Sequence, residues 1–320
     1  MSGRRPERGA ALLTAMIIVT LVSTLAAAMV WQQYRAVQVE GAERARTQAA
    51  LILQGALDWA RLILREDARA NQNQPVDHLG EVWAVPLAEA RLSTFLAADR
   101  SNNSSSDDGP EAFLSGSIDD AQSRYNLRNL VGGPSVPPAE LRALQRICDA
   151  VGVPVDVATK LADSLRQALG PPATGPQAQS TPLAPPSLDQ LGWLGLSTDH
   201  LERLRSRVIL LPVATPLNLN TASRELLATV FDGMDLATAQ RLVQARQSKP
   251  FQNVQEVLAL VPASAQIDGT RASVSSNFFE IRGRLRLEDR LLEEHSVVQR
   301  RGLDMVAIYR QRQNLLAPTP

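Results

Sequence analysis

The sequence predicts an α+β fold in which a long N-terminal helix packs on an antiparallel sheet and an all-helical domain is inserted into the sheet domain. An apolar segment followed, without proline, by an amphipathic pattern predicts a helix that runs to about Arg69. Period-two alternation predicts strands at 112–118 and again after residue 275, whereas the chain from Pro138 onward is helical in pattern. Because one interrupted sheet explains this order better than two incomplete sheets, we expect an inserted helical domain.

The first helix begins with a segment that could cross a membrane. Residues 10–30 carry no charge, and the next charged residue is Arg35. A helix of this length spans about 31 Å, the thickness of a hydrocarbon core. Three arginines against one glutamate precede the segment, which predicts a cytoplasmic N-terminus and a periplasmic remainder.

Three interpretations of this segment compete. A signal peptide would be cut near Ala26–Ala28, and a plain signal anchor would not be cut. The third interpretation rests on Gly9, which lies between the basic leader and the apolar helix and resembles the end of a type IV prepilin leader. Such a leader is cut on the cytoplasmic side, here between Gly9 and Ala10, and the apolar helix stays. The amphipathic continuation of the helix favours this third interpretation.

The strands of the sheet domain are expected in two groups. In the first, 82–89 reads as an edge strand, and 112–118 as a strand that ends in a turn at Asp119–Asp120 before a short second strand. In the second, 276–289 and 295–312 read as two long strands joined by an irregular link. The helical block between them resembles a SAM-like or helix–hairpin–helix module, with Ser187, Ser197 and either Thr221 or Ser223 as helix caps.

These elements predict the following organisation of the chain: a leader (1–9), a transmembrane segment (10–30), the periplasmic part of the helix (31–75), the first part of the sheet domain (76–136), the inserted helical domain (137–265) with a disordered loop (170–187), the C-terminal strands (266–311) and a tail (312–320).

Composition argues against several classes of function. The formal net charge is zero, so a whole-chain footprint for nucleic acid is not expected. Cys148 is the single cysteine, which excludes an intrachain disulfide, and we expect it to pack as a small apolar residue. The histidines lie far apart at 78, 200 and 295, and no catalytic constellation is present. We therefore expect a protein that is not an enzyme.

Two short motifs complete the pattern. The stretches "IDDAQSRYNLRNLV" and "LNLNTAS" lie on either side of the helical block. Together with the leader, the long helix and the late strands, they resemble the K-type minor pseudopilins of type II secretion systems over nearly the whole chain. The positions that match the family motifs are Asp119, Asp120, Gln122, Tyr125, Asn126, Asn218, Asn220 and Thr221.

The resemblance implies a role in a short periplasmic filament. Such a subunit lies in the inner membrane with its C-terminal domain in the periplasm, and it contacts membrane lipid, prepilin peptidase and the secretion platform. It joins the I- and J-type minor pseudopilins and the major pseudopilin, nucleates the filament from its tip, and supports export of folded proteins. Thr14, the fifth residue after the expected cut, fits this role, because most pilins carry Glu there whereas the K type lacks it.

The resemblance also implies a calcium site, and here the sequence departs from the family. The acidic stretch keeps Asp163, but Arg166 replaces a neighbouring acidic position, and 170–186 contains no acidic residue. Calcium needs about six to eight oxygen ligands, so we expect that site to be absent, and no cofactor is expected. Asp107, Asp108 and Glu111 remain weak candidate ligands for a metal.

A membrane-anchored helix–hairpin–helix protein that binds DNA, as in competence systems, is the alternative function. Its hairpin would offer backbone N–H groups to phosphate. Here the hairpin reads "FDGMDLA", in which Gly233 has no partner glycine. Because Asp232 and Asp235 would repel phosphate, we expect no nucleic-acid partner.

Overall fold

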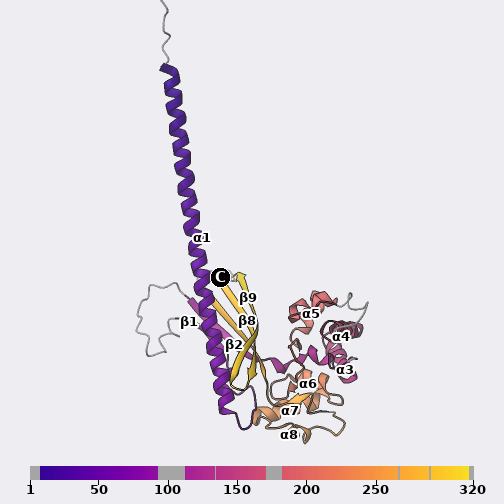
Figure 1. Cartoon of the computed structure of the whole chain (residues 1–320). Coiled ribbons are helices and arrows are strands. Elements are labelled where there is room, and N and C mark those ends of the chain that lie inside the picture. The colour runs from indigo at the N-terminus through magenta and orange to yellow at the C-terminus, as the bar shows by residue number, and fades with distance from the viewer. Residues whose placement is uncertain are drawn as a thin grey trace, which may run out of the picture. The chain divides into compact units, whose positions relative to one another are not determined.

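The computed structural model describes residues 8–92, 112–133, 135–170, 182–265, 267–287 and 290–316, with side chains from residue 11 to residue 315. The chain divides into two compact units, Met1–Gly55 and Ala56–Pro320. Helix α1 (Arg8–Ala70) begins in the first unit and ends in the second (Figure 1). In the first unit it is a single helix whose residues 11–41 are all exposed.

The second unit contains one five-stranded antiparallel sheet. Its order is β1 (Leu87–Arg91), β2 (Ala112–Asp120), β7 (Phe278–Leu287), β8 (Arg290–Arg301) and β9 (Asp304–Leu316). Strands β2 and β7 are neighbours, and Asp120 lies opposite Phe279. A single sheet therefore forms from strands before and after the insertion, which confirms the predicted fold class.

The two faces of the sheet pack against different parts of the second unit. On one face, Leu57 and Leu64 of α1 form a buried cluster with Phe279 and Val298. On the other face, Phe278 and Val297 pack with Ala121, Ile209 and Leu211, which precede or belong to the inserted block. Adjacent residues of a strand point to opposite faces, so Phe279 belongs to the cluster with α1 and Phe278 to the cluster on the other face.

The inserted block is helical, as predicted, and carries the largest apolar core. Its helices are α3 (Pro138–Ala150), α4 (Val155–Leu169), the 3₁₀ helix η5 (Leu188–Leu194), α5 (Thr198–Leu204), α6 (Arg224–Val230), α7 (Leu236–Ser248) and α8 (Val254–Leu258) (Figure 1). Ser197 and Ser223 cap α5 and α6 through their side chains, whereas Ser187 makes no capping hydrogen bond to η5. Cys148 is fully buried in this core.

Two short parallel strand pairs join the helical block to residues that lie outside its predicted limits. β3 (Tyr125–Asn126) pairs with β4 (Val208–Ile209), and β5 (Leu217–Asn218) pairs with β6 (Ala272–Ser273). Tyr125, Leu127 and Val274 belong to the same core as the helices. The helical core therefore includes side chains that the sequence pattern assigns to the sheet domain.

Three expectations about strands are wrong in whole or in part. The predicted edge strand is present from Leu87 onward as β1, but residues 82–84 form a 3₁₀ helix, η1 (Val82–Ala84), because Trp83 turns inward to be buried against Phe279, 5.3 Å between ring centroids. Strand β2 continues through Asp119–Asp120, and the turn follows as the 3₁₀ helix η2 (Ala121–Ser123). The C-terminal region holds three strands where two were expected, because Gly302, with φ of +61°, turns the chain between β8 and β9.

The predicted irregular link at 286–294 is largely strand. Cross-strand ion pairs make this charged stretch compatible with a sheet: Arg284 pairs with Glu293 at 2.5 Å, and Arg312 pairs with buried Glu294 at 2.5 Å. Strand β9 extends to Leu316, so residues 312–316 are sheet and not tail. Most of the loop predicted to be disordered, residues 171–181, lies outside the described residues.

Candidate functional site

The motif residues on either side of the helical block meet at one buried point. Asp120 ends β2, Asn218 ends β5 and Thr221 follows β5, yet the side chains of Asn218 and Thr221 both contact Asp120. We call the cluster of Asp67, Asp77, Glu81, Asp120, Asn218, Thr221, Ser276 and Arg300 the junction. It lies where the chain leaves the sheet for the insert and where it returns.

Asp120 is the centre of the junction. Its carboxylate accepts hydrogen bonds from the side chains of Asn218 at 2.9 Å, Thr221 at 2.6 Å and Ser276 at 2.7 Å. It also accepts from the backbone N–H of Gln122 at 2.8 Å, which caps η2. Burial raises the pKa of Asp120 to about 6, although the hydrogen bonds from Thr221 and Ser276 favour the ionised form. One carboxylate thus connects the sheet to both ends of the insert.

Asp77 and Arg300 extend the junction toward α1. Asp77 accepts from the backbone N–H of Ser276 at 2.7 Å and from the guanidinium of Arg300 at 2.9 Å. The same guanidinium donates to Asp67 of α1 at 2.7 Å, and its Cζ lies 4.7 Å from the centre of the Phe279 ring. Arg300 is therefore the shared cation of two carboxylates, in the planar geometry that favours arginine over lysine.

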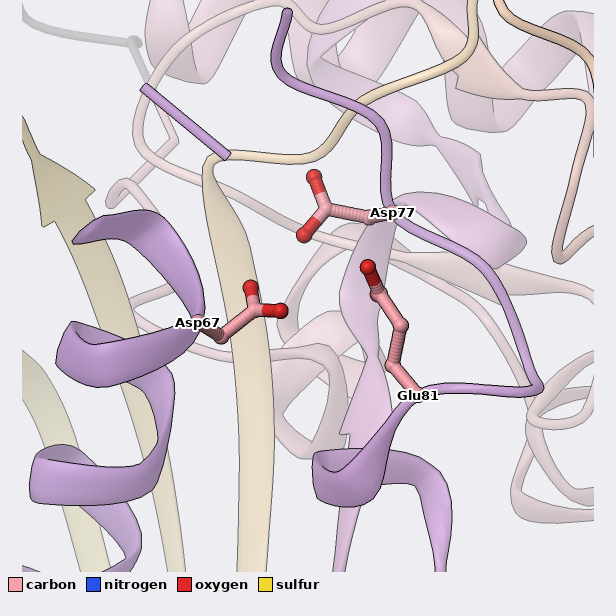
Figure 2. Close-up of side chains that lie close together, drawn as sticks. All are labelled: Asp67, Asp77 and Glu81. Atoms are coloured by element: carbon pink, nitrogen blue, oxygen red, sulfur yellow. The ribbon is translucent and has the colours of Figure 1, made fainter. Parts of the chain in front are cut away.

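Three carboxylates crowd together beside this arginine. Ligand atoms of Asp67, Asp77 and Glu81 all lie within 4.8 Å of one another. Figure 2 shows Asp67 on the helix and the other two on the loop that follows it. Such a cluster could hold a cation in principle, but Arg300 already supplies the positive charge to Asp67 and Asp77. We therefore interpret it as a structural ion-pair network.

Glu81 differs from its two neighbours because no arginine pairs with it among the described ion pairs. It accepts from the indole N–H of Trp83 at 2.6 Å and from the backbone N–H of His78 at 3.0 Å. Burial, together with the charge of Asp67, raises the pKa of Glu81 to about 7. Burial likewise raises the pKa of both Asp67 and Asp77, which the charge of Arg300 opposes.

Other motif residues hold the ends of the insert by hydrogen bonds to the backbone. Gln122 donates to the carbonyl of Pro216 at 3.1 Å and accepts from the N–H of Asn277 at 2.6 Å. Asn220 both donates to and accepts from the backbone of Phe251, each at 3.0 Å. These amides satisfy backbone groups that would otherwise be buried without partners.

Asn126 and Tyr125 fix the start of the insert. Asn126 donates to the carbonyl of Val213 at 2.8 Å and accepts from the N–H of Leu211 at 3.2 Å. The hydroxyl of Tyr125 donates to Glu140 of α3 at 2.8 Å, and Glu140 pairs with Arg271 at 2.5 Å. Burial raises the pKa of Tyr125 well above its usual value, so the phenol stays protonated and donates.

Two further predicted residues, Asp119 and Asp163, lie exposed outside the junction. Asp119 is exposed, and its carboxylate accepts from Ser117 at 3.1 Å. Asp163 is exposed on α4. The other candidate metal ligands, Asp107, Asp108 and Glu111, lie outside the described residues.

The hairpin between α6 and α7 is built for packing within the chain. Gly233 has φ of +77°, and a Cβ there would lie 2.1 Å from the carbonyl oxygen of Ser264. Asp232 pairs with Arg142 at 2.8 Å and also with Arg146, both on α3. A carboxylate of the chain thus occupies the arginines nearest the hairpin, which disfavours phosphate binding there.

A groove of about 940 Å³ lies between the second face of the sheet and the loops of the insert. Its floor carries Glu280, which pairs with Arg124 at 2.5 Å and with His295 at 3.2 Å. Burial would raise the pKa of Glu280, but the hydrogen bond from His295 and the charge of Arg124 outweigh it and lower that pKa to about 2. The charges on this floor are therefore matched within the chain.

The apolar part of α1 presents no unsatisfied hydroxyl among its described threonines. Thr14 donates to the carbonyl of Ala11 at 3.0 Å, and Thr20 and Thr24 donate back to their own helix in the same way. Gly9 and Ala10 lie in the first turn of the helix. Within the described residues α1 is the one helix long and apolar enough to cross a membrane, with a mean hydropathy of 2.3 in its most apolar window.

Comparisons with known proteins match this architecture. A family model described as type II secretion system protein K matches residues 217–275, which begin at the strand that carries Asn218. The type II secretion system protein K of Pseudomonas aeruginosa is 28% identical over 316 residues, covering 93% of this chain and 90% of that protein. Over nearly its whole length the chain is similar to type II secretion system protein K.

A second protein K and a solved complex show the same similarity. The protein K of Pectobacterium carotovorum subsp. carotovorum is 25% identical over 339 residues, covering 96% of this chain and 97% of that protein. In the solved GspK–GspI–GspJ complex from enterotoxigenic Escherichia coli, one chain matches with a TM-score of 0.63 and 19% identity, over 85% of this chain and 98% of that chain. This likeness shows that the K-family fold is shared.

Sequence reasoning missed part of the junction. Asp77, Ser276 and Arg300 complete the network but were not singled out. Arg300 stands in an ordinary strand pattern, and its ion pairs to Asp67 and Asp77 reach across the fold. Nothing local distinguishes such a residue, because its role depends on contacts with residues more than 200 positions away.

Proposed function

We propose that this chain is the minor pseudopilin at the tip of a type II secretion pseudopilus. In this role it nucleates the filament with I- and J-type minor pseudopilins, joins the major pseudopilin, and supports export of folded periplasmic proteins. The solved relative in a complex with GspI and GspJ supports these partners. The junction supports a non-catalytic role, since the carboxylate of Asp120 is taken up by hydrogen bonds from Asn218, Thr221 and Ser276.

The observation that carries the proposal is the uncharged, exposed start of α1. Residues from Leu12 to Val30 are exposed in the single chain, and Thr14 replaces a carboxylate with a hydroxyl that bonds to its own helix. An ionised side chain in the centre of a bilayer costs about 2.5–3.5 kcal/mol when it has no partner. A subunit with no neighbour above it avoids that cost by carrying Thr14.

The proposed topology is a single pass through the inner membrane with a cytoplasmic N-terminus and a periplasmic domain. Prepilin peptidase would cut between Gly9 and Ala10, and the secretion platform would then receive the mature subunit. N-terminal sequencing of the membrane-extracted protein tests this, in cells with and without the peptidase. We expect a start at Ala10 only with the peptidase; a start at Met1 in both, or one after Ala28, would refute the assignment.

Substitution of Thr14 tests the role at the tip. Thr14→Glu is expected to place an unpaired carboxylate in the apolar region, to reduce assembly of the complex with the I- and J-type subunits, and to lower secretion at least severalfold. Thr14→Val, which stays uncharged, is the matched control and should secrete normally. Equal secretion by the two variants would count against a tip position.

A further inference from the structure

The uncharged part of α1 ends in a cluster of aromatic and basic side chains. Trp31 and Tyr34 are both 62% exposed, and the guanidinium carbon of Arg35 lies 5.2 Å from the centre of the Trp31 ring. The spacings of three and four residues place these side chains on one face of the helix. Each aromatic ring combines an apolar body with a polar N–H or O–H group.

The position of this cluster corresponds to a membrane boundary. From Ala10 to Trp31 a helix rises about 31 Å, while the hydrocarbon core of a bilayer is about 30 Å thick. Tyr34 and Arg35 lie about 5–6 Å further along the axis at ~1.5 Å per residue, which is the depth of the headgroup layer. Trp and Tyr are enriched at this boundary in membrane proteins.

The charge of Arg35 is available to an anionic group. No acidic residue lies three or four positions before or after it. The next basic residue along the helix, Arg44, is by contrast paired with Glu40 at 2.5 Å. A phosphate of a lipid headgroup is the anion present at the depth where Arg35 would lie.

We propose that Trp31, Tyr34 and Arg35 form an interfacial anchor that binds the phospholipid headgroup layer and fixes how deep α1 sits in the membrane. This proposal rests on the membrane insertion proposed above. A protein neighbour in the filament is the competing occupant of the same face. Lipid is favoured because the cluster lies one hydrocarbon thickness from Ala10 and because Arg35 keeps its charge free of an acidic partner on its own helix.

Depth-dependent quenching of tryptophan fluorescence tests the anchor. The full-length protein is reconstituted alone, at high lipid-to-protein ratio, in vesicles of phosphatidylethanolamine and phosphatidylglycerol. The lipids carry bromine either at acyl carbons 6,7 or at carbons 11,12. The emission of Trp31 is obtained as the difference between wild type and Trp31→Phe. Trp193→Phe is the matched control, because Trp193 is similarly exposed, at 58%, in the inserted block.

We expect the Trp31 difference signal to be quenched at least twofold more by the shallow bromines than by the deep ones. The Trp193 difference signal should be quenched by neither. Arg35→Gln should lower the ratio of shallow to deep quenching, whereas Arg44→Gln should leave it unchanged.

Quenching of Trp31 mainly by the deep bromines, or no quenching in protein that floats with the vesicles, would overturn the anchor while leaving the membrane insertion intact. The second of these results would point to a protein neighbour as the occupant. Failure of the protein to float with vesicles would overturn the membrane insertion of the proposed function together with the anchor. An unchanged quenching ratio in Arg35→Gln would remove Arg35 from the anchor.

Discussion

Replacing Asp120 by alanine should lower the free energy of unfolding, because the carboxylate of Asp120 connects the sheet to the insert. The change removes the acceptor of four hydrogen bonds, whose donors are the side chains of Asn218, Thr221 and Ser276 and the backbone N–H of Gln122. Asn218 keeps other acceptors, but the hydroxyl of Ser276 and the N–H of Gln122 lose the acceptor they had. Each orphaned buried donor costs about 1–3 kcal/mol, which gives a gross loss of about 4 kcal/mol.

The raised pKa of Asp120 reduces this loss at neutral pH and makes it depend on pH. Since the folded-state pKa is about 6 against an ordinary value of 3.8, the folded protein binds the proton more tightly than the unfolded chain. The stability linked to this proton is complete below pH 3.8 and disappears as the pH rises through 6. We expect a net loss of about 3 kcal/mol at pH 7 and about 1 kcal/mol more at pH 5.

Urea unfolding of the full-length protein in mild detergent, followed by tryptophan fluorescence, measures this loss. Asp119→Ala is the matched control, since Asp119 is adjacent but exposed, and it should change the free energy of unfolding by less than about 0.5 kcal/mol. A loss for Asp120→Ala below about 1 kcal/mol, or one that is the same at pH 5 and pH 7, would refute the role assigned to the carboxylate.

Three further predictions concern the same unit. Burial raises the pKa of Glu81 to about 7 from 4.5, so the contribution of Glu81 to stability should fall by about 2 kcal/mol as the pH rises between these values, allowing for partial exposure. Unfolding curves of Glu81→Gln should lack this part of the pH dependence and keep the part that comes from Asp120. Gly233→Ala should lower the free energy of unfolding by more than about 2 kcal/mol, because the new Cβ would clash with the carbonyl of Ser264. The control Gly302→Ala, which is strained in φ but has open space around it, should lower it by about 1 kcal/mol. Equal losses would contradict the close approach of the Ser264 carbonyl to Gly233. Arg300→Met should cost about 3–5 kcal/mol by leaving buried Asp77 and partly buried Asp67 without their cation. A smaller loss of stability in thermal unfolding would mean that those carboxylates are already protonated.

The fold class and helix composition of this chain could be predicted from periodicity. The helical insert followed from apolar residues spaced by three and four, and strand β7 followed from its alternation. Periodicity failed at Val82–Ala84, where Trp83 is drawn inward by Phe279, and at Arg290–Glu294, where cross-strand partners neutralise the charges. For Trp83 the deciding partner lies far along the chain, whereas Glu293 and Glu294 find theirs on neighbouring strands, 9 and 18 residues away.

The candidate site was predicted only in part, for the same reason. Asp120, Asn218 and Thr221 could be selected by resemblance, but their meeting point could not. That point depends on Ser276 and Arg300, which have no local signature. A hydrogen-bonded centre made from five separate stretches of chain becomes visible only when the chain is folded.

The register that places Asp120 opposite Phe279 has a consequence for how the sheet assembles. Strands β2 and β7 are sheet neighbours, so everything between them behaves as a very long hairpin loop. Bringing the ends of an unstructured loop of this length together costs on the order of 4–5 kcal/mol of chain entropy. A folded insert already holds its own ends side by side through the hydrogen bonds to Asp120. The helical block therefore acts as the turn of a hairpin. A chain in which that block cannot fold should also pair β2 with β7 less readily.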